Sequence, residues 1–507
     1  MAQIVPADAF PFCGPTNLSV SPIIDAERAI NLYPDPGIAS SKSRFGLTGR
    51  PGLASIGVTA LGGGYGHSLF AGSGRLFVST GTHVYEVDEA GRIITDYGTG
   101  IDNGGPTQTP MIANGTQLLI CDPATGKIFN INPIGPGHPT ASLDPVFNGV
   151  ALEYLDEFYI AIATGGSLQG ANPNQINVSA NSDGRVWPGL AYTFETSAAD
   201  LTIQLATLNS LLYIFGQKTL RIWYNAGNAV FPFARVNGGV VNLGCLAAAS
   251  VVKFSNTILW LGSDATGYGQ VYMLQGMNPV RVSNAAIEQM ITTMTYNRKL
   301  VNARAYGYQE AGHTFWVLNL ISSSLAGLVS GLTLVYDLTT GLWHERAFAA
   351  GSGNPLIPTG FANVPAFGGI YPTYVLDEIT GQLWNSSIQI ANDEGTAITY
   401  TRIAPHVSNQ RRWIKYPRFE LDMDQGDGNI APILDYSNGK VVSGALQFLG
   451  RNYPLAQAQD AGAEGTAQQF YATQLGRSRD RTFKVTITDD TNLIRIANAS
   501  IYAEATA

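Results

Sequence analysis

The chain of 507 residues carries little charge, because Asp, Glu, Lys and Arg together make up 13% of it, against about 25% in typical globular domains. Glycine and tyrosine are plentiful, at 57 and 23 residues. Glycine adopts positive φ angles without steric penalty, and tyrosine favours strands. A helical protein of this size would contain more Glu, Lys and Leu at a helical period. The composition therefore predicts an all-β protein with short strands and tight turns.

Reactive and metal-binding residues are also scarce. Cys13, Cys121 and Cys245 are far apart, and no CxxC pair occurs, so no disulfide framework or zinc ribbon is indicated. The six histidines show no HxxxH or HxH spacing, and the chain has no GxSxG, no phosphate-binding loop and no GxGxxG after a strand. We therefore expect no cofactor, no metal and no enzymatic activity.

Long apolar segments are missing as well. The start, MAQIVPADAF, has neither a basic region nor an apolar core, so a signal peptide is not expected. The uncharged run between His313 and Asp337 contains four serines, an asparagine and two glycines, which predicts strand, loop, strand rather than a membrane helix. We expect a soluble protein that is made in a cytoplasm and does not insert into membranes.

The net charge of −8 is unevenly distributed. Residues 1–395 hold 17 basic and 26 acidic side chains, which gives −9, and residues 396–507 hold 12 and 11, which gives +1. Proteins that wrap nucleic acid need clustered Lys and Arg to bind phosphates. This distribution of charge argues against such wrapping, but it allows DNA to pass along the protein without binding to it.

A weak repeat combines an apolar strand, an aspartate, a short gap, a glycine and a second apolar strand. It occurs in VYEVDEAGRII (84–94), LLICDPATGKIF (118–129), LVYDLTTGLW (334–343) and YVLDEITGQLW (374–384). In three copies the aspartate precedes the glycine by four positions, in the pairs Asp122 and Gly126, Asp337 and Gly341, and Asp377 and Gly381. Aspartate at the start of a turn accepts backbone N–H bonds, and glycine closes the turn in the left-handed region. The spacing therefore predicts hairpin turns.

Hairpin units recur near residues 80, 122, 165, 216, 265, 330 and 379, about 40 to 65 residues apart. This period favours a β-propeller over a sandwich or a β-helix. The count is six or seven blades, because strand material from residues 50–75 could complete the last unit. We expect an extended segment over 1–55, a propeller over 56–395 and a β-sandwich-like platform domain over 396–507, where strands alternate as in RTFKVTITDD.

Two clusters are candidate sites. Asp422, Asp424 and Asp427 could ligate calcium, but the glycine falls one residue early and Ile433 stands where a bidentate glutamate is needed, so a plain turn is favoured. The run RSRDR, with Arg477, Arg479, Asp480 and Arg481, is the densest basic stretch. It is compatible with a subunit interface, with intrachain or solvated contacts, or with DNA.

The segment SPIIDAERAINLYPD (21–35), followed by GLTGRPGLASIG (46–57), resembles the start of the tail nozzle proteins of short-tailed bacteriophages, also called packaged-DNA stabilisation proteins. That family shows NLYPE and GTPGL where this chain has NLYPD and GRPGL, so it departs at Asp35 and Arg50. VSANSDGRVW (178–187) and the closing segment 475–504 are similar to the family too. These matches lie at both ends and in the middle of the chain.

The resemblance implies a structural protein of the virion tail, assembled in the cytoplasm of the host bacterium. It implies a homo-hexameric ring below the portal that extends the DNA channel and helps to retain packaged DNA, with an adaptor, a tail fibre or tailspike, and a plug or needle as partners. DNA would pass through the lumen without sequence preference. Residues 1–55 would contact the adaptor or a neighbouring subunit, with Arg28, Asn31 and Tyr33 as candidate contacts. The alternatives are a propeller that binds or hydrolyses carbohydrate and a generic propeller scaffold.

Overall fold

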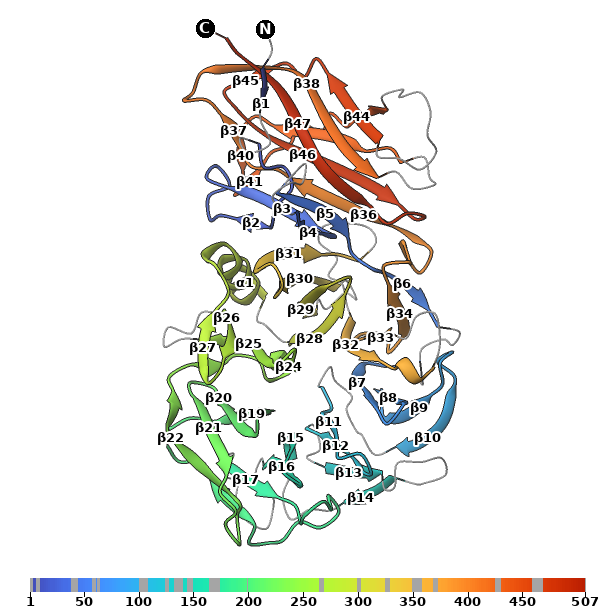
Figure 1. The fold of residues 1–507 in the computed structure, drawn as a ribbon, viewed down its shortest axis with the longest axis vertical. Helices are drawn as coiled ribbons and strands as arrows, with labels where there is room; N and C mark the ends of the chain where they lie inside the picture. Colours follow the sequence, from blue (N-terminus) through green and yellow to red (C-terminus); the bar gives the residue numbers. More distant parts are fainter. Residues whose placement is uncertain are drawn as a thin grey trace.

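The computed structural model describes most of the chain. The described residues are 3–5, 10–37, 44–56, 61, 64–99, 108–123, 127–131, 140–143, 149–163, 174–197, 199–263, 269–298, 302–323, 329–348, 358–367, 373–424, 430–457 and 468–506. Within them the chain is almost entirely β-strand, with one α-helix, α1 (Ala285–Arg298). A ring of sheets occupies one end of the molecule and a β-sandwich the other (Figure 1).

The described strands of the ring form seven antiparallel blades of a propeller. Five are separate sheets, and the sixth and seventh are hydrogen-bonded to one sheet of the sandwich through β3 (Ala26–Ile30) and β35 (Asn392–Asp393). Blade one contains β7 (Gly66–Gly72), β8 (Arg75–Thr80), β9 (His83–Val87) and β10 (Ile93–Thr99); blade two contains β11 (Met111–Ala113), β12 (Leu118–Asp122), β13 (Lys127–Ile131) and β14 (Thr140–Leu143); blade three contains β15 (Gly149–Leu155), β16 (Phe158–Ala163), β17 (Gln175–Val178) and β18 (Tyr192–Phe194). Blade four contains β19 (Thr202–Leu208), β20 (Leu211–Gly216), β21 (Leu220–Asn225) and β22 (Phe233–Val241); blade five contains β23 (Gly244–Cys245), β24 (Val252–Phe254), β25 (Thr257–Ser263), β26 (Gly269–Gln275) and β27 (Asn278–Arg281). Blade six contains β28 (Asn302–Glu310), β29 (His313–Ser323), β30 (Val329–Asp337) and β31 (Leu342–Arg346); blade seven contains β32 (Pro358–Asn363), β33 (Thr373–Asp377) and β34 (Leu383–Ser387) and is completed by β6 (Gly52–Ser55).

The seventh blade settles the number of blades, since its outer strand comes from the start of the chain. Strand β6 pairs antiparallel with β34, with Trp384 opposite Ser55 and Ser387 opposite Gly52. The innermost strands β7, β11, β15, β19, β24, β28 and β32 adjoin one another in a closed circle. The propeller therefore has seven blades, and its first and last segments are hydrogen-bonded to each other.

Apolar side chains fill the spaces between neighbouring blades. Between blades four and five, for example, Phe215 and Trp260 meet edge to face with ring centroids 5.3 Å apart, and both are fully buried. Such aromatic pairs add roughly 0.5–1.5 kcal/mol beyond the burial of their area. The middle strands of the blades, such as β12 and β25, are buried along their whole length, and this packing between blades holds the ring together.

The hairpin between the first two strands of a blade usually closes with two residues at positive φ. This is the geometry of the type I′ turn, which matches the twist of paired strands. The turns are Ser73–Gly74, Asp156–Glu157, Asn209–Ser210, Ser255–Asn256 and Ala311–Gly312.

Two facing sheets form the sandwich. One is ordered β4 (Leu32–Pro36), β5 (Phe45–Gly49), β47 (Arg495–Thr506), β38 (Trp413–Asp424), β44 (Gln468–Thr473) and β43 (Ala456–Gln457), with β1 (Gln3–Val5) and β45 (Arg477–Ser478) at its margins. The other contains β3 (Ala26–Ile30), β36 (Thr396–Ile403), β46 (Asp480–Asp489) and β39 (Ile433–Ser437). Residues from both sheets bury a common apolar core. The first 50 residues thus contribute strands to the sandwich, and both termini lie at its far end (Figure 1).

The long uncharged run of the sequence lies in β29 and β30, which pair antiparallel from Phe315 opposite Asp337 to Ser323 opposite Val329. The prediction of strand, loop, strand is confirmed for the residues described on either side of the connection. Among the described residues, no helix is both long enough and apolar enough to cross a bilayer.

Candidate interaction surfaces

The motif residues of the first 55 positions lie at the joint between the sandwich and the propeller. Asn31, at φ 61°, separates β3 from β4, and its side-chain oxygen accepts hydrogen bonds from Arg50 Nε at 2.9 Å and from the Ala347 amide at 2.8 Å. Arg50 is buried and forms a bidentate ion pair with buried Asp393. Its guanidinium also donates to the carbonyl oxygen of Ala347 at 2.9 Å. Arg50, one of the two departures from the family pattern, thus ties the strand that closes the propeller to the sandwich.

The other two predicted contact residues of this segment also have partners within the chain. Arg28 forms a bidentate pair with Glu345 of β31, with Nε 2.9 Å from Oε1. Tyr33 is buried against the rings of His313 and Phe315, at centroid distances of 5.0 and 5.1 Å. Asp35, the second departure from the family pattern, lies 3.5 Å from His313 Nε2. The structure therefore places these side chains at the internal joint.

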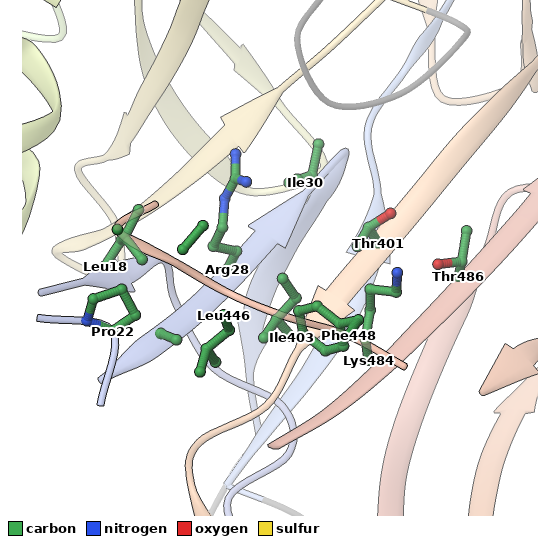
Figure 2. A pocket seen from close by; sticks show the side chains of 13 residues that line it. Leu18, Pro22, Arg28, Ile30, Thr401, Ile403, Leu446, Phe448, Lys484 and Thr486 are labelled. Atoms are coloured by element: carbon green, nitrogen blue, oxygen red, sulfur yellow. The ribbon is translucent and has the colours of Figure 1, made fainter. Parts of the chain in front are cut away.

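A groove runs along this joint and is continuous with an exposed apolar loop. One part, about 330 Å³, lies between the hairpin of β2 (Asn17–Leu18) and β3, strands β36 and β46, and the segment 444–448; Figure 2 shows its lining side chains. A second part, about 560 Å³, continues along α1 and shares Leu18, Pro22 and Arg28 with the first. Beside it, the side chains of Val20, Ile23 and Ile24 are exposed by 76%, 58% and 76%. Contiguous exposed apolar surface of this kind marks protein-interaction sites.

His406 holds this loop to the sandwich. Its Nδ1 lies 2.9 Å from Oδ1 of Asp480, and its Nε2 lies 2.7 Å from the carbonyl oxygen of Pro22. Both partners are acceptors, so both bonds form only when the imidazole carries two protons. The bond to Asp480 is the main cause that raises the pKa of His406 above its usual 6.5, although burial opposes it. Asp480 is thus engaged within the chain.

The basic run 477–481 divides into a buried and an exposed part. Arg481 is buried, with its guanidinium over the rings of Tyr416 and Tyr436 at 4.4 and 3.9 Å. Arg477 and Arg479 are exposed, and each guanidinium carbon lies 5.0 Å from the centre of the Trp413 indole.

A second basic strip, which sequence reasoning missed, lies beside these exposed arginines. Strand β45 pairs with the start of β38, so that Ser478 is opposite Ile414 and Arg477 is opposite Lys415. Exposed Arg411 and Arg412 directly precede β38. The letters QRRW (410–413) are visible in the sequence, but nothing local indicates that they meet a run more than 60 residues later.

The predicted turn residues lie at blade hairpins. Oδ1 of Asp337 accepts the Thr339 amide at 2.9 Å, and Oδ1 of Asp377 accepts the Thr380 amide at 2.9 Å. Gly341 and Gly381 have φ of 72° and 66°. Asp122 is buried at the end of β12, and Gly126 lies outside the described residues.

The candidate calcium residues do not gather in the described part of the chain. Asp422 and Asp424 belong to β38, which ends at Asp424, and Asp427 lies outside the described residues. Among the described residues there is no group of three or more His, Cys, Asp or Glu side chains suited to a metal. The three cysteines are buried, and burial raises the pKa of the Cys13 and Cys245 thiols to about 12.

The propeller encloses a central cavity of about 340 Å³ that is lined from all seven inner strands. Its described lining contains one carboxylate, Glu153, whose pKa is raised by burial. Thr207 donates to Glu153 at 3.1 Å and accepts from Lys253 at 2.9 Å. Hydrolysis of glycosides ordinarily needs two carboxylates across the scissile bond, and the described lining offers one.

Comparison with solved structures gives distant matches. Solved structures with similar shape include a streptogramin B lyase, 9% identical with a TM-score of 0.39, which covers 66% of this chain and 97% of the lyase chain. The WD40 domain of Neurospora crassa Pan2 is 11% identical with a TM-score of 0.41, and the match covers 66% of this chain and 96% of that domain. Likeness at this level carries no argument about fold or function. No curated protein matches the chain.

A protein-family model identifies the chain more specifically. The model described as "Bacteriophage P22 Gp10, beta-propeller", of the phage stabilisation family, matches residues 72–336, from the first blade to the end of β30 in the sixth. This is more than half of the 507 residues. The protein therefore belongs to the phage stabilisation family of β-propeller proteins and has a structural role in a phage.

Proposed function

We propose that the protein is a non-enzymatic wall subunit of a short phage tail, six copies of which form the nozzle ring that extends the DNA channel and helps to retain the packaged genome. The match to the phage stabilisation family over residues 72–336 is the observation that carries this proposal. The propeller, closed through β6 and joined to the sandwich by the buried ion pair of Arg50 and Asp393, supplies the rigidity that a wall needs.

Because the central cavity of the propeller is small, we place the DNA channel between several chains and not inside one propeller. A cavity of about 340 Å³ has the size of a small-molecule pocket and is far too small for a DNA duplex. A DNA channel can therefore form only where several copies surround it. Residues 1–395 carry −9, and a lumen lined by this part would repel phosphates, so that DNA slides without sticking.

We assign contacts with the adaptor or a neighbouring copy to the groove and to the loop with Val20, Ile23 and Ile24, because this apolar surface is exposed on the single chain. A tail fibre or tailspike and a plug or needle complete the proposed set of partners. Assembly would take place in the host cytoplasm, and the finished ring would belong to the virion tail.

Electron microscopy of the purified chain mixed with the adaptor tests the proposal. We expect six-fold rings with the propeller in the wall, and we expect the Ile23→Asp, Ile24→Asp double variant to remain unassembled. A matched Val230→Asp variant, at an exposed apolar position of the propeller between β21 and β22 and outside the groove, should assemble normally. A chain that stays monomeric with every tail component and cleaves glycans would contradict the proposal. Tight DNA binding by assembled rings at low salt would contradict the sliding lumen alone.

A further inference from the structure

We propose that the surface formed by Arg411, Arg412, Trp413, Arg477 and Arg479, here called the Trp413 patch, is a docking site for a carboxylate-rich segment of another protein. The patch lies at the end of the sandwich farthest from the propeller, since Trp413 pairs with Thr506 next to the C-terminus (Figure 1). This inference goes beyond the wall function and does not depend on whether rings form.

The four arginines of the patch have no acidic partner in the described part of the chain. None of them forms an ion pair there, although the chain carries a net charge of −8 and most of its other described arginines contact carboxylates. Like charges brought together on two adjacent strands repel one another. Unpaired guanidinium groups at one spot therefore indicate a partner with negative charge.

The packing of the patch orients the guanidinium groups of Arg477 and Arg479. Both stack on the indole of Trp413, which limits the freedom of these long side chains before any partner binds. A side chain that is already ordered loses less entropy on binding. The planar fork of each guanidinium is free to receive a carboxylate with two parallel hydrogen bonds.

The same geometry favours a protein partner over nucleic acid. With a guanidinium on it, the indole of Trp413 is poorly placed to stack with bases, which is the usual role of aromatic residues in single-strand binding. The patch contains arginines and a tryptophan, and these two residue types dominate the energetic centres of protein interfaces. Lysine also suffices to neutralise phosphates, but Lys415, which lies opposite Arg477, is paired at 3.2 Å with Glu504.

Fluorescence anisotropy with the full chain tests the proposal, with a short labelled polyglutamate peptide and a labelled DNA duplex of random sequence as probes. We expect the peptide to bind more tightly than the duplex at the same salt concentration. The Arg477→Glu, Arg479→Glu double variant should weaken peptide binding about tenfold or more. The matched Lys218→Glu, Arg92→Glu variant, which reverses two exposed charges on the propeller, should leave it unchanged.

A conservative variant separates geometry from charge. Arg477→Lys with Arg479→Lys keeps both charges but removes the planar fork, and we expect peptide binding to weaken by several-fold. Unchanged peptide binding by the charge-reversed variant would overturn the proposal, as would no binding by the natural chain. Duplex DNA that binds as tightly as the peptide, with the same loss on charge reversal, would overturn it in favour of a phosphate-binding surface.

Discussion

At the scale of single residues, the joint between sandwich and propeller depends on buried charge. The side chains of Arg50 and Asp393 are exposed by 1% and 0%, and the guanidinium also bonds to Asn31, Pro51 and Ala347. Removal of one member of a buried pair leaves the other charged without a partner, which is strongly destabilising. The pair therefore fixes how the closing strand enters the seventh blade.

We predict that Arg50→Leu lowers the free energy of unfolding by about 3–5 kcal/mol, because Asp393 then remains buried and unpaired. Denaturant unfolding followed by tryptophan fluorescence measures the change. The double variant Arg50→Leu, Asp393→Leu should recover part of the loss. Arg185→Ala, which breaks the exposed pair with Asp183, is the control and should change stability little. Equal effects of Arg50→Leu and Arg185→Ala would contradict a structural role of the buried pair.

Because His406 holds the loop with the exposed apolar residues to the sandwich, the attachment of this loop depends on pH. Asp480 raises the pKa of His406 by its hydrogen bond, burial lowers it, and the carbonyl of Pro22 and the charge of Asp25 add to the rise. The folded-state pKa therefore exceeds the unfolded value. Protonated His406 stabilises the fold fully below pH about 6.5, and this contribution disappears as pH rises through the folded pKa.

We predict that His406→Gln destabilises the chain more at pH 5.5 than at pH 9, values chosen to lie about one and more than two units from the ordinary histidine pKa. Asp480→Asn should show the same trend, since it removes the carboxylate that holds the proton. Hydrogen exchange of residues 19–25 should increase in both variants at the lower pH. If the variants lost the same amount of stability relative to the natural chain at both pH values, the imidazolium would not hold the loop.

At the scale of elements, the closure of the ring depends on β6. A Cβ atom added at Gly52 would lie 2.4 Å from the carbonyl oxygens of both Ile390 and Asn392, which are backbone atoms that cannot move away easily. We predict that Gly52→Ala lowers stability by roughly 1–3 kcal/mol through this overpacking. Gly189→Ala is the matched control, because nothing lies within 4 Å of its added Cβ. Thermal unfolding compares them, and equal melting temperatures would contradict the importance of β6.

The hairpin units could be predicted from the sequence because their signal is local, and the seven predicted centres each fall within or beside one blade. The number of blades stayed at six or seven, because the seventh blade is completed by pairing between β6 and the distant β34. The aspartate turns mark hairpins but not positions within a blade. Asp377 lies between the second and third strands of its blade, whereas Asp337 lies between the third and fourth. Turn chemistry is local and depends on the four residues of the turn alone. Position within a blade depends on pairing along the whole chain.

The interaction surfaces could be predicted only in part, because they depend on pairing between distant segments. The sequence indicates Arg477 and Arg479 as candidates, and the structure leaves both exposed. The burial of Arg481 two residues later follows from Tyr416 and Tyr436 on other strands, which no local pattern reveals. The meeting of 411–413 with 477–479 likewise follows from the register between β38 and β45.

At the scale of the whole molecule, the central cavity of the propeller is too small to be a DNA channel, which agrees with the proposed role of the propeller in a wall. The family match, the closed seven-bladed ring and the single carboxylate in the described cavity lining agree with a structural role. The sandwich adds a second body, whose Trp413 patch lies at the end opposite the propeller. The surface proposed for ring assembly and the surface proposed for an acidic partner are therefore separate.

The most direct test of the structural role is a phage that carries a stop codon in place of an early codon of this gene. Particles purified from a non-suppressing host would be assayed for DNA protected from nuclease and imaged by electron microscopy. We predict heads that package DNA but lose it, with tails that lack their distal ring, and recovery when the protein is added back. Particles with intact tails and fully retained DNA would contradict the account.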